Sequence, residues 1–383
     1  MAAAGQVAAG EVAAGMPAGE GAARDAAMAA AVQPPLPFRH TPGYHALVLA
    51  LGVWVAVMAA FVLHLPDPWW AGISAWMIGQ AGQDRKAMLD KASMRFAGTI
   101  IGCILGFEIG GRLIGFGPLA VALVMSVVFW FATRKRFTSP HSYAWLVACL
   151  TFAMSVLGAV GNPADLAAFV VARGMEITVG ILGTTLVVLL LAPPARPPGP
   201  QNAVKAPPGS VQAMEIEHVA IISAVTAPAI IGLVILLDLP SAMQIFVSSI
   251  AVTDRSLGTM QTKALQRLIG CVLGGVPGIV LALLLPGHLF PWSLALFTGM
   301  FLFTFLHQGD PKTSYFGTQA GIAFLMGLIT GSGPPTSIGP VIERVIGIML
   351  GVAILLLVTI VLKPLLAGRI RAGRHVVVET ERA

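Results

Sequence analysis

Charged residues are scarce in this chain, and their scarcity excludes several classes of protein. Only 10% of the 383 residues are Asp, Glu, Lys or Arg, whereas 56% are hydrophobic. A soluble domain usually carries about a quarter charged residues. No basic patch is interleaved with aromatic residues, so we expect no nucleic-acid partner. Repeated uncharged runs approach the roughly 20 residues that cross a bilayer, and they predict a polytopic membrane protein in contact with lipid.

Cysteines and catalytic motifs are also few. The three cysteines, Cys103, Cys149 and Cys271, lie far apart within apolar runs, and their odd number indicates no disulfide framework. The chain has no GxxxxGK[ST] loop, no HExxH motif and no Cys/His cluster. We therefore expect no enzyme activity, no cofactor and no metal site.

The first 42 residues lack the basic segment and apolar core of a signal peptide. Ala and Gly dominate this stretch, which predicts a disordered cytoplasmic tail over residues 1–42. A regulatory or partner-binding arm is the alternative.

One segment occurs twice. Residues 91–106 read KASMRFAGTIIGCILG, and residues 263–278 read KALQRLIGCVLGGVPG. In each, a lysine lies four residues before an arginine, and three glycines follow that arginine at helical spacing: Lys91, Arg95, Gly98, Gly102 and Gly106, then Lys263, Arg267, Gly270, Gly274 and Gly278. The arginine and glycines share one helix face, which is typical of close helix packing in membranes. We expect the glycine faces of the two copies to approach each other.

The repetition extends beyond this segment. Ser142 and Tyr143 return 172 residues later as Ser314 and Tyr315, and with one residue slipped Arg173 returns as Arg344. A constant offset of this kind indicates a tandem duplication.

The duplication predicts an all-α fold with about twelve transmembrane helices in two tandem, parallel six-helix repeats. The expected helices are 45–64, 69–82, 93–110, 116–133, 143–160, 170–192, 219–237, 241–253, 264–285, 290–307, 314–330 and 340–362. The expected domains are the tail 1–42, repeat 43–195, a Pro-rich cytoplasmic linker 196–215, repeat 216–366 and a basic cytoplasmic tail 367–383.

Basic residues predict the orientation, because Lys and Arg collect on the cytoplasmic side of short loops. With the N-terminus inside, only Arg112, Arg173 and Arg344 fall at the outer face. Both termini are then cytoplasmic, and the two repeats cross the membrane in the same direction.

The second helix of each repeat is short and polar toward its end. Gln80 and Gln83 follow the tryptophan-rich stretch in the first repeat, and Gln244 and Ser248 lie within the second. Interrupted helices at matching positions often mark a transporter's site. Trp76, with the neighbouring tryptophans, could stack on an aromatic ring. The alternative is a tilted helix without a ligand.

Arg95 and Arg267 are the other candidates for a substrate pathway. Two guanidinium groups at its inner mouth would attract carboxylates, which arginine can bind through two hydrogen bonds. The alternative is that both side chains extend from the helix to the lipid headgroups.

Ionisable residues near the outer face are candidates for ion pairs or proton coupling. Arg173 precedes Glu176, and Glu343 precedes Arg344, at the start of each repeat's last helix. His45 and His218 open the first helix of each repeat and could carry a proton or act as interfacial anchors.

The stretch PDPWWAGISAWMIGQAGQDRKAMLDKASMRFAGTIIGCILG resembles the fusaric acid resistance / aromatic acid exporter (FUSC) family. The family's signature is a short aromatic-rich helix, a polar loop and an Arg-x-x-Gly-Thr-x-x-Gly-x-x-x-Gly helix. Its residues are matched by Arg95, Gly98, Thr99, Gly102 and Gly106. The second copy has Cys271 where the family favours Thr. The resemblance covers roughly residues 43–366, without the large cytoplasmic domain that separates the halves of longer exporters.

This resemblance implies a multi-pass transporter of the bacterial inner membrane that exports small organic anions, especially aromatic carboxylates. Some relatives use a periplasmic adaptor, and a homo-oligomer is a further possibility. One alternative is a voltage-driven anion channel or uniporter like the distantly related plant malate channels, since 100 mV supplies about 2.3 kcal/mol per charge. A non-transporting membrane scaffold is the other.

Overall fold

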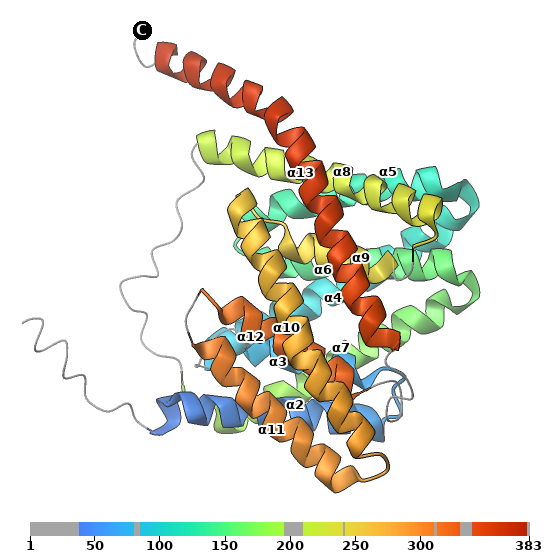
Figure 1. The fold of residues 1–383 in the computed structure, drawn as a ribbon, viewed down its shortest axis with the longest axis vertical. Coiled ribbons are helices and arrows are strands. Elements are labelled where there is room, and N and C mark those ends of the chain that lie inside the picture. Colours follow the sequence, from blue (N-terminus) through green and yellow to red (C-terminus); the bar gives the residue numbers. More distant parts are fainter. Residues whose placement is uncertain are drawn as a thin grey trace, which may run out of the picture.

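The computed structural model describes residues 38–79, 85–194, 210–239, 242–309, 312–329 and 339–380. These residues form twelve α-helices and three short 3-10 helices, without a strand among them (Figure 1). The first half contains α2 (Pro42–Val62), α3 (Pro68–Gly79), α4 (Arg85–Leu113), α5 (Gly117–Thr138), α6 (Ser142–Gly161) and α7 (Leu166–Leu191). The second contains α8 (Ser210–Leu237), α9 (Ala242–Val252), α10 (Leu257–Leu284), α11 (Leu289–Gln308), α12 (Ser314–Leu328) and α13 (Gly339–Thr380).

Local chemistry accounts for several helix boundaries. Proline occupies the first turn of α2, where its missing N–H costs nothing, and the Thr41 side chain accepts a hydrogen bond from the Tyr44 N–H. Ser256 caps α10 in the same way, accepting from the Thr259 N–H. Gly117, with a φ of 76°, makes the turn into α5.

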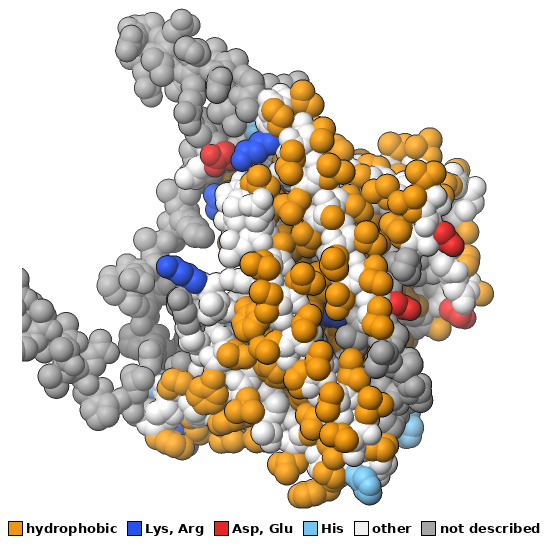
Figure 2. All heavy atoms as spheres, viewed as in Figure 1, with side chains coloured by type: hydrophobic (Ala, Val, Ile, Leu, Met, Phe, Trp, Pro, Cys, Tyr) orange, Lys and Arg blue, Asp and Glu red, His pale blue; other side chains and the backbone are white. Residues whose placement is uncertain are grey.

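Eight helical runs among the described residues are long and apolar enough to cross a membrane. One of them, Arg85–Thr138, contains both α4 and α5. The remaining helices are shorter, with 12 residues in α3, 11 in α9 and 15 in α12. Apolar side chains cover most of the described surface on the face drawn in Figure 2. The chain is therefore an all-α, multi-pass membrane protein.

Two helices extend further than the sequence predicted. The helix α8 begins at Ser210, inside the expected linker 196–215, because the last helix breakers of that stretch are Pro207, Pro208 and Gly209. The helix α13 continues to Thr380, through the expected tail 367–383, since no proline follows Pro364. Polarity suggested an end to these helices, but backbone propensity allows them to continue.

The two halves pack in matching ways. In the first half α4 packs on α6 and α2 on α7, and in the second α10 packs on α12 and α8 on α13. Contacts between the halves are reciprocal: α5 meets α8 as α11 meets α2, and α6 meets α9 as α12 meets α3. In Figure 1, α2 at the bottom and α8 at the top both run from left to right.

The glycine faces lie against a different partner from the one expected. A Cβ atom added to Gly102 would lie 2.7 Å from the Ala148 carbonyl oxygen of α6, and one added to Gly278 would lie 2.7 Å from the Phe324 carbonyl oxygen of α12. The other four glycines, Gly98, Gly106, Gly270 and Gly274, meet the same two helices. The prediction that α4 and α10 approach each other through these faces is therefore wrong. The small residues of α6 and α12 offer each glycine face a close partner within its own half.

Candidate functional site

A cavity of about 510 Å³ lies between the two halves. Every helix except α2 and α8, the first of each half, contributes to its wall. The short helix α3 supplies Trp69, Trp70 and Met77, and α9, its counterpart, supplies Gln244 and Val247. Because α3 and α9 pack against α12 and α6 of the opposite half, they bring the two repeats together around this space.

Basic residues dominate the charge of this cavity. Six cationic side chains line it: Lys91, Arg95, Arg136, Lys263, Arg267 and Arg344. Within the described part of the chain, no Asp or Glu side chain belongs to the wall. The rest of the wall is largely aromatic, aliphatic or thioether, so the cavity suits an anion with an apolar body.

Arg95 is held in the wall by a neutral partner. Its side chain lies on the same face of α4 as the glycines that pack on α6, so it points toward that helix. The Nη1 atom donates a hydrogen bond of 2.8 Å to the Tyr143 hydroxyl, and the Lys91 ammonium lies 5.0 Å from the centre of the Tyr143 ring. Although Arg95 is only 6% exposed, its positive charge is not neutralised by this contact.

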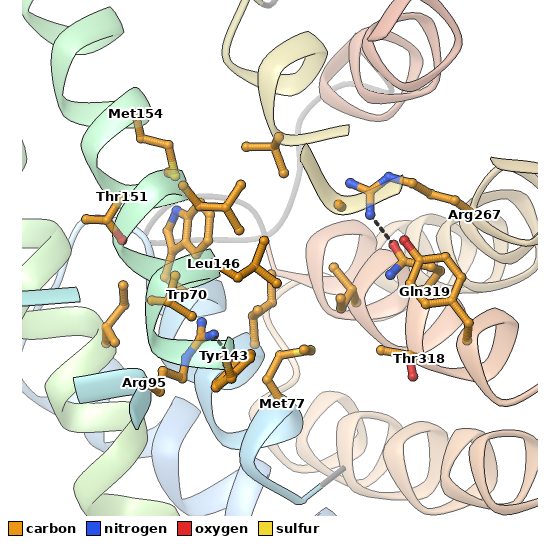
Figure 3. A pocket seen from close by; sticks show the side chains of 18 of the residues that line it. Trp70, Met77, Arg95, Tyr143, Leu146, Thr151, Met154, Arg267, Thr318 and Gln319 are labelled. Carbon is orange, nitrogen blue, oxygen red and sulfur yellow. Dashed lines mark hydrogen bonds between the residues drawn. The ribbon is translucent and has the colours of Figure 1, made fainter. Parts of the chain in front are cut away.

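Arg267 repeats this arrangement in the second half. Its Nη1 atom donates a hydrogen bond of 2.6 Å to the Gln319 side-chain oxygen on α12, again a neutral partner. Figure 3 shows Arg95 with Tyr143 on one side of the cavity and Arg267 with Gln319 on the other. The two arginines thus face the cavity from opposite halves.

The structure separates the expected pathway residues. Arg95, Arg267 and Gln244 line the cavity, whereas Gln80 and Gln83 lie outside the described residues. Trp76 is fully buried and donates its indole N–H to the Thr318 carbonyl at 3.1 Å, so it packs α3 on α12 instead of facing the cavity.

Ser248 occupies the corresponding position 172 residues after Trp76 and is also outside the wall. It is fully buried, and its Cβ atom would lie 3.1 Å from a Cβ added to Gly351, so it faces α13. At both positions, contact between helices takes the side chain that sequence reasoning assigned to the pathway.

The outer ionisable residues form a compact cluster in the first half. Arg173 Nη1 lies 2.8 Å from Glu176 Oε2, and Arg173 Nη2 lies 3.5 Å from Asp67 Oδ2. The Asp67 backbone N–H also donates to Glu176 Oε1 at 2.8 Å. The Arg173 guanidinium stacks 4.2 Å from the Trp70 ring, which connects this cluster to the cavity wall.

The other expected ionisable residues are dispersed. In the second half Arg344 is buried at the cavity, while Glu343 is exposed. His45 is buried at the start of α2 and His218 is half-buried in α8, and neither belongs to the cavity wall.

Sequence reasoning missed several residues of the wall. Tyr143 and Tyr315 marked the duplication but were not considered as ligands, although a repeated tyrosine in an apolar helix was a usable signal. Arg136 was counted only as a cytoplasmic charge, yet it lines the cavity and donates to the Ile250 carbonyl at 3.1 Å. Gln319 had no repeat to indicate it.

Comparison with known proteins connects this architecture to transport. Residues 44–206 match the fusaric acid resistance protein family, and residues 227–358 match the fusaric acid resistance protein-like family. Curated relatives include the p-hydroxybenzoic acid efflux pump subunit AaeB of Escherichia coli O1:K1 / APEC and that of Shigella boydii serotype 18 (strain CDC 3083-94 / BS512). Each is 30% identical over 157 residues, which cover 39% of this chain and 24% of the relative. No solved structure matches the chain.

Proposed function

Because the chain belongs to the fusaric acid resistance protein family, we propose that it exports small organic anions through the cavity between its halves. The observation that carries this proposal is the cavity wall, with six cations and no carboxylate among its described residues. A buried cluster of like charges attracts a counter-ion, and arginine suits a carboxylate.

Aromatic carboxylates are the substrate class that we propose first. Trp69 and Trp70 line the cavity, and their rings can stack on an aromatic body. The relatives that are named as p-hydroxybenzoic acid efflux pump subunits support the same class. We propose twelve membrane crossings, with the short α3 and α9 included, and both termini in the cytoplasm.

The test is uptake and release of benzoate in proteoliposomes. Replacing both Arg95 and Arg267 by Gln removes two of the cavity's charges, and a charge-assisted hydrogen bond contributes about 1.5–3 kcal/mol. We expect flux to fall roughly tenfold or more in the double variant. Arg112→Gln is the control, since Arg112 is exposed and paired with Glu108 away from the cavity. Wild-type flux in the double variant would contradict the proposal.

The same liposomes distinguish coupled export from passive flux. With the voltage clamped to zero, an imposed pH gradient drives benzoate through a proton-coupled exporter, whereas a channel or uniporter responds only to voltage and the benzoate gradient. Complete absence of flux under all conditions would favour a scaffold.

A further inference from the structure

The duplication places the same three polar residues in each half. Arg95, Tyr143 and Arg173 of the first half correspond to Arg267, Tyr315 and Arg344 of the second. Each set comes from the third, fifth and sixth helices of its half. Their polar atoms, however, have different partners in the two halves.

In the first half these groups are occupied by one another or by carboxylates. Arg95 donates to the Tyr143 hydroxyl at 2.8 Å. Arg173 is neutralised by Glu176 at 2.8 Å and by Asp67 at 3.5 Å. The first copy therefore provides its own anion.

In the second half the corresponding groups remain uncompensated. Arg267 donates to Gln319, which stands where the first half has Val147, so the Tyr315 hydroxyl is left buried without a hydrogen-bond partner. Arg344 contacts the sulfur atoms of Met326 and Cys271, which are neutral partners. Among the ion pairs that the structure describes, none involves Arg267 or Arg344.

The chain cannot supply the missing carboxylate at the position of Glu176. Its counterpart, with the offset that relates Arg173 to Arg344, is Gly347. A Cβ atom added there would lie 2.6 Å from the Gln244 Cβ, because α9 packs directly on the α13 backbone. Helix packing excludes a side chain at this point, so an anion must come from outside the protein.

Arg267, Tyr315 and Arg344 all line the cavity. The two arginines are only 4% and 5% exposed, and they are close enough for their charges to repel each other. Two buried like charges without a counter-ion are costly, whereas a bound carboxylate would neutralise them and accept the Tyr315 hydroxyl proton in a hydrogen bond.

We propose that Arg267, Tyr315 and Arg344 form a carboxylate-binding subsite, which holds the charged end of the substrate in the second half of the protein. The apolar body then extends toward Trp69 and Trp70 of the first half, where Arg173 already has its own carboxylates. The ligand class is a monocarboxylate with an aromatic or other apolar body. This inference rests on the proposed function, since it assigns an orientation to the exported anion.

The test compares benzoate with benzamide, its uncharged isostere, by calorimetric binding to the full-length protein in nanodiscs. We expect benzoate to bind at least about tenfold more tightly than benzamide, as expected for a charge-assisted contact. Arg344→Gln should remove this preference, while Arg344→Lys, which retains the charge, should keep most of it. Tyr315→Phe should reduce benzoate affinity severalfold and Tyr143→Phe, its match in the first half, should reduce it less.

Equal binding of the two compounds to the wild type, or an unchanged preference in Arg344→Gln, would overturn the subsite. A larger effect of Tyr143→Phe than of Tyr315→Phe would do so as well, and this pair decides the matter if Arg344→Gln fails to fold. Binding is measured without transport, so the two proposals can fail separately. Charge-selective binding without flux would refute export alone, and flux without charge selectivity would refute the subsite alone.

Discussion

At the scale of single residues, the paired carboxylates in the first half explain how a buried arginine can be tolerated. Arg173 is 4% exposed and Glu176 is fully buried, yet both retain partners through their mutual contact and Asp67. Because Arg173 also stacks on Trp70, the cluster positions one of the cavity's aromatic walls. Charge balance and the shape of the cavity are thus connected at this point.

Replacing Glu176 by Gln should destabilise the protein strongly. The change leaves Arg173 buried without its nearest anion, and breaking a buried ion pair typically costs about 3–5 kcal/mol. Glu108→Gln is the matched control, because Glu108 also pairs with an arginine at 2.7 Å but the side chains are 51% and 77% exposed. Thermal unfolding in detergent should show a clear drop in Tm for the first variant and little change for the second. Equal Tm values would mean that the cluster contributes no stability.

At the scale of helices, the repeated glycines determine how closely each third helix approaches the fifth helix of its half. A Cβ added to Gly98 would lie 2.5 Å from the Ala144 carbonyl oxygen, and one added to Gly270 would lie 2.8 Å from the Phe316 carbonyl oxygen. These are backbone atoms of the neighbouring helix, which cannot move aside as a flexible side chain could. The same close approach directs Arg95 and Arg267 into the cavity wall.

Gly102→Leu or Gly274→Leu should therefore disrupt folding. A large side chain at either position forces two helices apart, and overpacking costs about 1–3 kcal/mol or more. Gly232→Leu in α8 is the control, since a Cβ there meets nothing within 4 Å and the position is exposed. We expect the first two variants to lose yield of monodisperse protein in size-exclusion chromatography, while Gly232→Leu matches the wild type. Normal yield for both would place the glycine faces away from any helix contact.

At the scale of the whole molecule, reciprocal contacts between the halves enclose the cavity. Because α3 reaches α12 and α9 reaches α6, each half closes the space left by the other. Neither half alone could build a wall that combines the tryptophans of α3 with Arg267 and Arg344. The proposed site is therefore a property of the duplicated chain.

The proposed orientation predicts which loops an impermeant thiol reagent reaches from outside the cell. Single cysteines at Ser139 and Ser256, at the expected cytoplasmic ends of α5 and α10, should be protected in intact spheroplasts and react after lysis. A cysteine at Ala164, exposed between α6 and α7, should react in both. The wild-type chain provides the background, because Cys103, Cys149 and Cys271 are buried. Reaction of the first two positions in intact spheroplasts would reverse the topology.

The sequence by itself determined the all-α membrane character, the family and the approximate positions of the helices, because hydropathy and the repeated glycines act locally along the chain. It also identified Arg95 and Arg267, which stand beside those glycines. Only the tertiary structure decided that the glycine faces pack within each half, and that Trp76 and Ser248 serve helix packing. It also decided that Arg173 is neutralised while Arg344 is not. Those outcomes depend on which side chains distant segments bring together, and periodicity along one helix does not specify its neighbour.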